Sequence, residues 1–71
     1  MEKAELRNLL RVFKFAANGE RKAQKMYLKA KERFSKHEDC AKLFEWLYNE
    51  EAEHEEKLRE KYISLKEEKG L

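Results

Sequence analysis

The chain has no proline, only two glycines and a single cysteine, Cys40, among its 71 residues. One cysteine excludes an internal disulfide, and the lack of a C-x-x-C pair excludes a paired-thiolate metal site. No apolar run approaches the roughly 20 residues that cross a bilayer, and the first ten residues lack the apolar core of a signal peptide. Scarce glycine with abundant Lys, Glu, Leu and Ala predicts a helical protein, which we expect to be cytoplasmic.

Charged residues make up 45% of the chain, yet the formal net charge is only +2. Because the sequence shows neither a basic arm nor an acidic tail, we expect no nucleic-acid partner, which needs a concentrated positive face. The length fits one domain, residues 1–71. Chains below about 70–80 residues rarely build a sufficient core without disulfides, metal or oligomerisation. With disulfides excluded, metal, oligomerisation or both remain.

The first half of the chain has the apolar pattern of one helix from about residue 3 to 34. A stripe at spacings of four and three residues is apolar at every position but one. Its members are Leu9, Phe13, Ala16, Glu20, Ala23, Tyr27, Ala30 and Phe34. The pair Asn18-Gly19 interrupts the pattern, since a mid-helix glycine costs about 1 kcal/mol relative to alanine. The stripe keeps its phase there, which favours one helix, and a break giving three helices is the alternative.

A turn is predicted at residues 35–38, and a second helix from about residue 36 to 67. Ser35 and Glu38 fit the S-x-x-E capping box at its start. The second stripe consists of Cys40, Leu43, Phe44, Leu47, Glu51, His54, Leu58, Tyr62 and Leu65. A short turn makes the helices antiparallel neighbours, each about 45 Å long. Because nothing in the chain covers their wide apolar face, we expect this all-α hairpin to dimerise into a four-helix bundle.

Three polar side chains stand within the apolar stripes. Glu20 lies 14 residues before Phe34 and Glu51 lies 13 residues after Glu38, so the two carboxylates should have similar heights above the turn. His54 follows one turn further on, and we expect the three side chains to converge. In a two-fold dimer the four carboxylates would repel one another, and two divalent ions would balance their charge. Neutral imidazoles from both copies of His54 would complete the ligand set.

This pattern matches the cores of di-iron bundles, in which two helices each give one Glu and two others each give Glu-x-x-His. We therefore predict two iron ions per dimer, with Glu20, Glu51 and His54 as metal ligands and catalytic residues. Manganese also suits oxygen-rich ligation, and zinc is a further possible metal, although zinc usually takes fewer carboxylates. Glu50 is the rival to Glu51, because it lies four residues before His54. Tyr27 is expected in the core, where its hydroxyl could donate a hydrogen bond to a ligand carboxylate.

Two segments resemble the rubrerythrin-type ferritin-like proteins. NGERKAQKMYLKA, residues 18–30, is similar to their first metal-binding helix, with Glu20 followed seven residues later by Tyr27. LFEWLYNEEAEHEEKL, residues 43–58, is similar to their second, with E-x-x-H followed by an apolar residue. The resemblance spans about residues 13 to 62. A single hairpin without a rubredoxin module is closer in plan to the encapsulated ferritins, whose di-iron site forms between two short chains.

The resemblance implies binding and oxidation of Fe(II) by dioxygen or peroxide, for iron handling or protection from oxidative stress. The chain would then be a ferroxidase or a peroxidase-type oxidoreductase acting as a homodimer or a higher oligomer. One alternative is rubrerythrin-type peroxide reduction with a separate electron donor, and another is a metal-free dimeric interaction protein. Among the remaining residues, Phe44, Trp46 and Cys40 are expected to pack, and His37, Glu53, Glu55 and Glu56 to be solvated.

Overall fold

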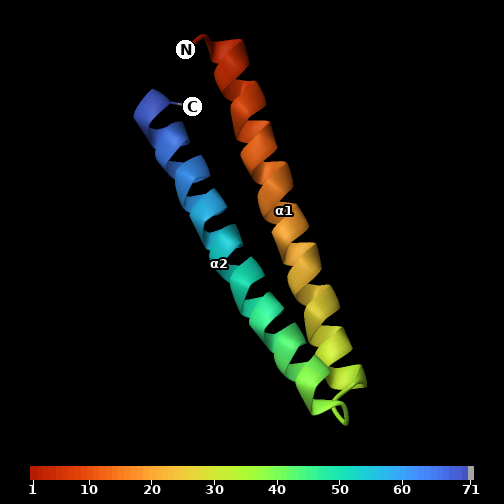
Figure 1. Ribbon diagram of the computed structural model, residues 1–71. Helices are drawn as coiled ribbons and strands as arrows, with labels where there is room; N and C mark the ends of the chain where they lie inside the picture. The colour runs from red at the N-terminus through yellow and green to blue at the C-terminus, as the bar shows by residue number, and fades with distance from the viewer. Residues whose placement is uncertain (71) are drawn as a thin grey trace.

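The computed structural model describes residues 1–70, and within this range the chain forms two long α-helices and no strand. Helix α1 spans Lys3–Arg33 and helix α2 spans Glu38–Lys69. The helices run antiparallel and side by side, joined by a short turn (Figure 1). The predicted all-α hairpin is therefore confirmed. Neither of these helices carries an apolar stretch that could cross a membrane.

Helix α1 continues without a break through Asn18-Gly19, so the favoured prediction of one helix here is confirmed and the three-helix alternative is wrong. A Cβ atom built on Gly19 would meet nothing within 4 Å. The hairpin itself therefore gives no steric reason for glycine at this position, although glycine weakens a helix interior.

The predicted capping box at the start of α2 is wrong. The N–H of His37 donates to the carbonyl oxygen of Phe34 at 3.0 Å, which closes a turn around Ser35 and Lys36. His37 is consequently the N-cap residue and has no side-chain capping bond, while Ser35 lies two residues too early to act as a cap. The whole helix is shifted toward the C-terminus, and it ends where Gly70 adopts a left-handed conformation with φ of 70°.

The hairpin buries few hydrophobic side chains, and these are Leu6, Leu10, Ala17 and Leu65. Its accessible surface is 5847 Å². A compact monomer of its mass would expose about 4,700 Å². Large apolar side chains that the hairpin leaves exposed include Val12, Phe15, Met26, Leu43, Trp46 and Ile63. Trp46 and Cys40 were expected to pack, but the hairpin alone covers neither of them.

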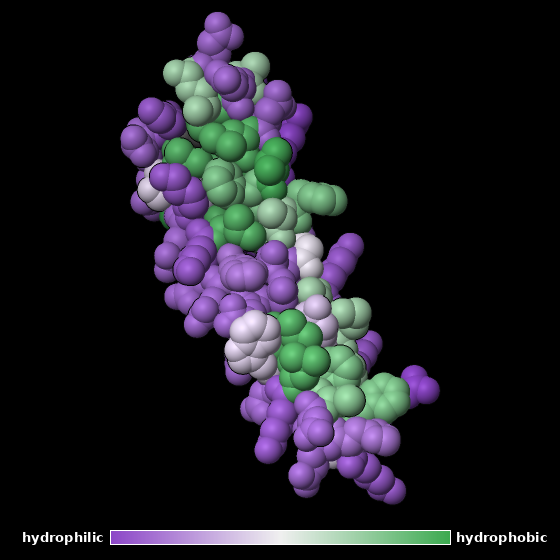
Figure 2. Space-filling view, viewed as in Figure 1, coloured by the Kyte–Doolittle hydropathy of each residue, from purple (hydrophilic) through white to green (hydrophobic). Residues whose placement is uncertain are grey.

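Three layers follow one another along the hairpin. At the end holding the termini, Leu9, Phe13 and Tyr62 pack against the buried leucines. Near the turn, the rings of Tyr27 and Phe44 stack with their centroids 6.4 Å apart. Polar side chains occupy the interface between these apolar layers, and Figure 2 shows a hydrophilic band separating two hydrophobic areas on one face. The polar layer therefore places charged and hydrogen-bonding side chains between the two helices, where an ordinary hairpin would have apolar ones.

The charges that balance over the whole chain are divided between the helices. Helix α1 has ten basic and three acidic residues, whereas α2 has six basic and eleven acidic residues. The two helices thus carry opposite net charges, although the chain has neither a basic arm nor an acidic tail. Net charges of +7 and −5 attract α1 to α2, which supports the pairing of two helices with a small apolar core.

Candidate metal centre

Glu20, Glu51 and His54 converge in the polar layer. His54 Nδ1 lies 3.5 Å from Glu20 Oε2 and 3.9 Å from Glu51 Oε2. One ligand atom from each of the three residues can be chosen so that all lie within 4.8 Å of one another. Glu20 and Glu51 come from different helices, and His54 shares a face with Glu51 because three residues are nearly one turn. The similar distances of Glu20 and Glu51 from the turn thus bring the three side chains together.

The donor set fits a divalent cation. Within residues 1–70, Glu20 Oε2 is buried and has no hydrogen-bond partner. A buried oxygen without a partner costs about 1–3 kcal/mol, so such an atom calls for an explanation. Two atoms bound to one ion at about 2.1 Å each can lie up to about 4.2 Å apart. The two separations from His54 Nδ1 fall within that limit, and both are too long for strong hydrogen bonds.

The three residues are accessible from outside the hairpin. The Glu20 and Glu51 side chains are 24% and 21% exposed, and the His54 side chain is 49% exposed. Two carboxylates and an imidazole provide hard oxygen ligands and one nitrogen, which suit iron or manganese. Three ligand residues do not fill the coordination sphere of such an ion, so further donors have room to approach.

The other predicted site residues lie apart from this group. Glu50, the rival to Glu51, contributes no atom to it. Tyr27 has Phe44 as its ring partner, and within the described chain its hydroxyl makes no hydrogen bond to either carboxylate. His37 is exposed in the turn, as expected.

Directly beside the three residues lies a polar network that the sequence analysis missed. Glu55 was expected to be solvated, but it is only 5% exposed, and Gln24 opposite it is 8% exposed. Gln24 Nε2 donates to Glu55 Oε1 at 2.7 Å. Arg21 Nε donates to both Glu55 oxygens at 3.0 and 3.1 Å, and Arg59 Nε donates to Oε2 at 2.6 Å. A buried carboxylate is tolerated here because every oxygen has a donor.

These bonds keep Glu55 ionised. The hydrogen bond from Gln24 is the main cause, and bonds from Arg59 and Arg21 act with it against burial, so the pKa of Glu55 is lowered from 4.5 to about 2. An unfolded chain binds this proton at about pH 4.5, whereas the folded chain resists it until about pH 2. The stabilisation is therefore present above about pH 4.5 and is lost as the pH falls toward 2.

We expect this group to contribute about 2 kcal/mol to the free energy of unfolding at pH 7, allowing for solvent screening of the partly exposed arginines. The measurement is urea unfolding of the chelator-treated protein at several pH values, compared with Glu55→Gln. The difference in unfolding free energy between the two proteins should shrink between about pH 5 and pH 2. Parallel curves would show that Glu55 carries no such linkage.

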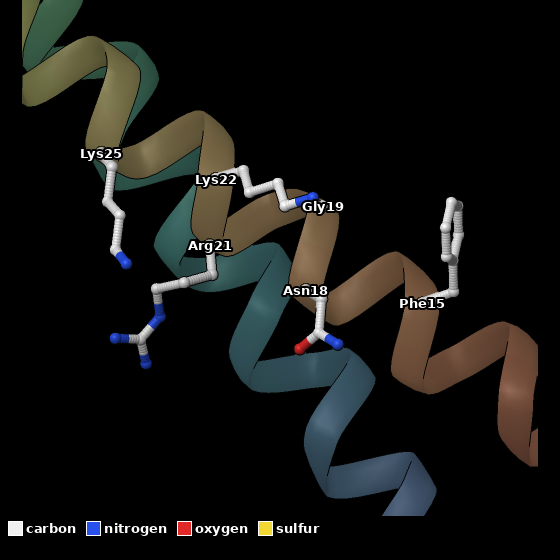
Figure 3. A pocket seen from close by; sticks show the side chains of 6 residues that line it. All are labelled: Phe15, Asn18, Gly19, Arg21, Lys22 and Lys25. Carbon is white, nitrogen blue, oxygen red and sulfur yellow. The ribbon is translucent and has the colours of Figure 1, made fainter.

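A hollow of about 490 Å³ lies on α1 around Gly19 (Figure 3). Its lining includes Asn18 and Arg21, which also contact α2 through Arg59 and Glu55. Phe15, 82% exposed, forms one side, and Lys22 and Lys25 are among the residues that line the rest. Its charged lining groups are cationic, so it offers no acidic or imidazole ligand for a metal. The chemistry of the hairpin is concentrated instead at Glu20, Glu51 and His54.

No family model matches the chain, and comparisons with curated proteins and with solved structures give no match either. The resemblance to rubrerythrin-type and encapsulated ferritins consequently stands on the motif residues alone, and membership of that family stays a prediction.

Proposed function

We propose that this hairpin is a ferritin-like metal protein, in which two copies pair and Glu20, Glu51 and His54 of both hold two iron ions. The observation that carries the proposal is the convergence of these three side chains around a buried carboxylate oxygen without a partner. Iron held by carboxylates and imidazole supplies one-electron redox chemistry toward dioxygen or peroxide. In this function, Fe(II) is the substrate that the chain binds and orients for oxidation.

Pairing of two hairpins is supported by the small core and by the exposed apolar side chains. A second copy would cover hydrophobic surface that one hairpin leaves open, and it would bring a second set of two carboxylates and one imidazole. Four carboxylates carry the charge that two divalent ions neutralise. The chain's own residues then have clear tasks, since Glu20 and Glu51 bind through oxygen and His54 adds a nitrogen ligand without adding charge.

The test is metal analysis of protein purified under reducing, iron-replete conditions, beside the double variant Glu51→Ala/His54→Ala. We expect about one iron per chain in the wild type and almost none in the variant. The matched control is Glu50→Ala/His37→Ala, which removes the same residue types outside the group and should keep its iron. A wild type without iron, or a Glu51→Ala/His54→Ala variant that retains it, contradicts the proposal.

Sizing with and without metal tests the pairing, because a site completed across two chains couples metal binding to assembly. Assays of Fe(II) oxidation and of peroxide consumption then separate a ferroxidase from the alternative peroxide reductase. Exposed Trp46 and Phe15 favour the other alternative, a metal-free interaction protein. That alternative gives no reason for polar residues at positions 20, 51 and 54.

A further inference from the structure

We propose that Gln24 is a positioning residue for the candidate metal centre, because its side-chain amide joins the main chains of Glu20 and Glu51. The inference rests on the proposed function, since it names the residue that holds two of the proposed ligands in place. It concerns a side chain outside the ligand set, and its consequences can be observed with and without metal.

The geometry places one nitrogen between the two ligand residues. Gln24 Nε2 lies 3.3 Å from the carbonyl oxygen of Glu20 and 3.5 Å from that of Glu51. The same nitrogen makes its shortest bond, 2.7 Å, to Glu55 Oε1. An amide nitrogen has two hydrogens, so the Glu55 bond takes one and the two carbonyls share the other. The amide thereby links α1 to α2 through its short bond to Glu55, and it adds longer contacts to the carbonyl oxygens of Glu20 and Glu51, the residues whose carboxylates converge.

The amide can perform this task because it is itself fixed. Gln24 is 8% exposed, and its main acceptor Glu55 is held from two sides by Arg21 and Arg59. Arg59 Nη2 also donates to Asn18 Oδ1 on α1 at 3.3 Å, which closes the network across the hairpin. A buried group with charge-assisted partners has little freedom to rotate. Supporting bonds of this kind commonly change metal affinity by about 10–100-fold when they are removed.

The variant that separates positioning from simple stabilisation is Gln24→Met, which keeps the length of the side chain and removes its donors. Glu55 retains both arginines, so we expect the hairpin to fold with a loss of about 1 kcal/mol. The matched control is Leu10→Val, which should cost about the same. Leu10 belongs to the apolar cluster near the termini, and it lies ten residues, about 15 Å along the helix, from Glu20.

Cobalt(II) is the probe, because its visible absorption reports both affinity and coordination geometry. We expect Gln24→Met to bind Co(II) about 10–100-fold more weakly than the wild type, with an altered absorption band. Leu10→Val should keep the wild-type band and stay within about threefold in affinity, although it is equally destabilised. Equal effects of the two substitutions would show that Gln24 merely stabilises the fold and would overturn the proposal.

A metal-free measurement distinguishes failure of this inference from failure of the proposed function. Nuclear Overhauser contacts between the His54 ring and the Glu20 side chain should be present in the wild type and in Leu10→Val, and weakened in Gln24→Met. If the wild type binds no Co(II) and no iron, the proposed function fails, and these contacts still decide whether Gln24 positions the group. Unchanged contacts in Gln24→Met overturn the positioning role.

Discussion

Replacing Glu55 by alanine is expected to lower the free energy of unfolding by about 3 kcal/mol at pH 7 and the melting temperature by roughly 15 °C. The substitution removes an acceptor shared by three donors and leaves the buried amide of Gln24 without its shortest bond. It also opens a gap in a hairpin that has few buried apolar side chains to compensate. The measurement is thermal and urea unfolding by circular dichroism, with chelator present and at a fixed chain concentration.

The double variant Gln24→Leu/Glu55→Leu is the control. It replaces both partners by apolar side chains, so no buried polar atom of this pair is left unmatched, and we expect stability within about 1 kcal/mol of the wild type. If Glu55→Ala destabilises the protein while the double variant is nearly neutral, the network fixes the arrangement of its side chains rather than adding net stability. A loss below about 0.5 kcal/mol in Glu55→Ala would mean that Glu55 behaves as an exposed residue.

The antiparallel hairpin was predictable because hydrophobic periodicity is a local property. Two stripes with spacings of three and four residues, separated by a short polar segment, leave little choice of fold. The convergence of Glu20 with Glu51 and His54 followed from counting residues outward from the turn. That count needs only the constant rise of a helix and is insensitive to an error of two residues in the helix ends.

The line of closest packing was not predictable in the same way. In α1 the most buried residues are Leu6, Leu10, Ala17 and Gln24. Three of these, Leu10, Ala17 and Gln24, lie one position after members of the predicted stripe. The apolar surface of α1 is broad, and α2 covers only one side of it. A stripe read as a single face concealed this division. Gln24 was therefore passed over although it stands in the contact with α2.

Glu55 was missed for a related reason. It sits in a run of glutamates in which composition cannot tell a solvated carboxylate from a buried one. Its burial depends on partners 31 and 34 residues away, Gln24 and Arg21, whose placement requires the register between the helices. One usable signal was present, since Arg59 follows Glu55 by four residues on the same face. The capping box did not form because Ser35, its first residue, lies inside the turn closed by the hydrogen bond from the N–H of His37 to the carbonyl oxygen of Phe34.

Replacing Glu20 by leucine is expected to raise the stability of the metal-free protein while abolishing metal binding. Glu20 Oε2 is buried without a hydrogen-bond partner. Leucine at this position would continue the apolar stripe of α1, and leucine has a high helix propensity. We expect a gain of about 1 kcal/mol in the free energy of unfolding with chelator present. Affinity for Fe(II) or Co(II) should fall at least about 100-fold, which is about 2.8 kcal/mol of binding free energy.

A metal-ligand residue should show these opposite effects, a gain in unfolding free energy and a loss of metal affinity when it is replaced. Such a residue destabilises the metal-free fold and is kept for the metal that it binds. Glu20→Gln is the matched control, since it keeps the shape, removes the charge and leaves a polar group in the same place. It should lose metal affinity as Glu20→Leu does, but without the gain in stability. If Glu20→Leu instead weakened the metal-free hairpin, the carboxylate would have a structural role in the fold. If it bound metal as the wild type does, Glu20 would not be a ligand.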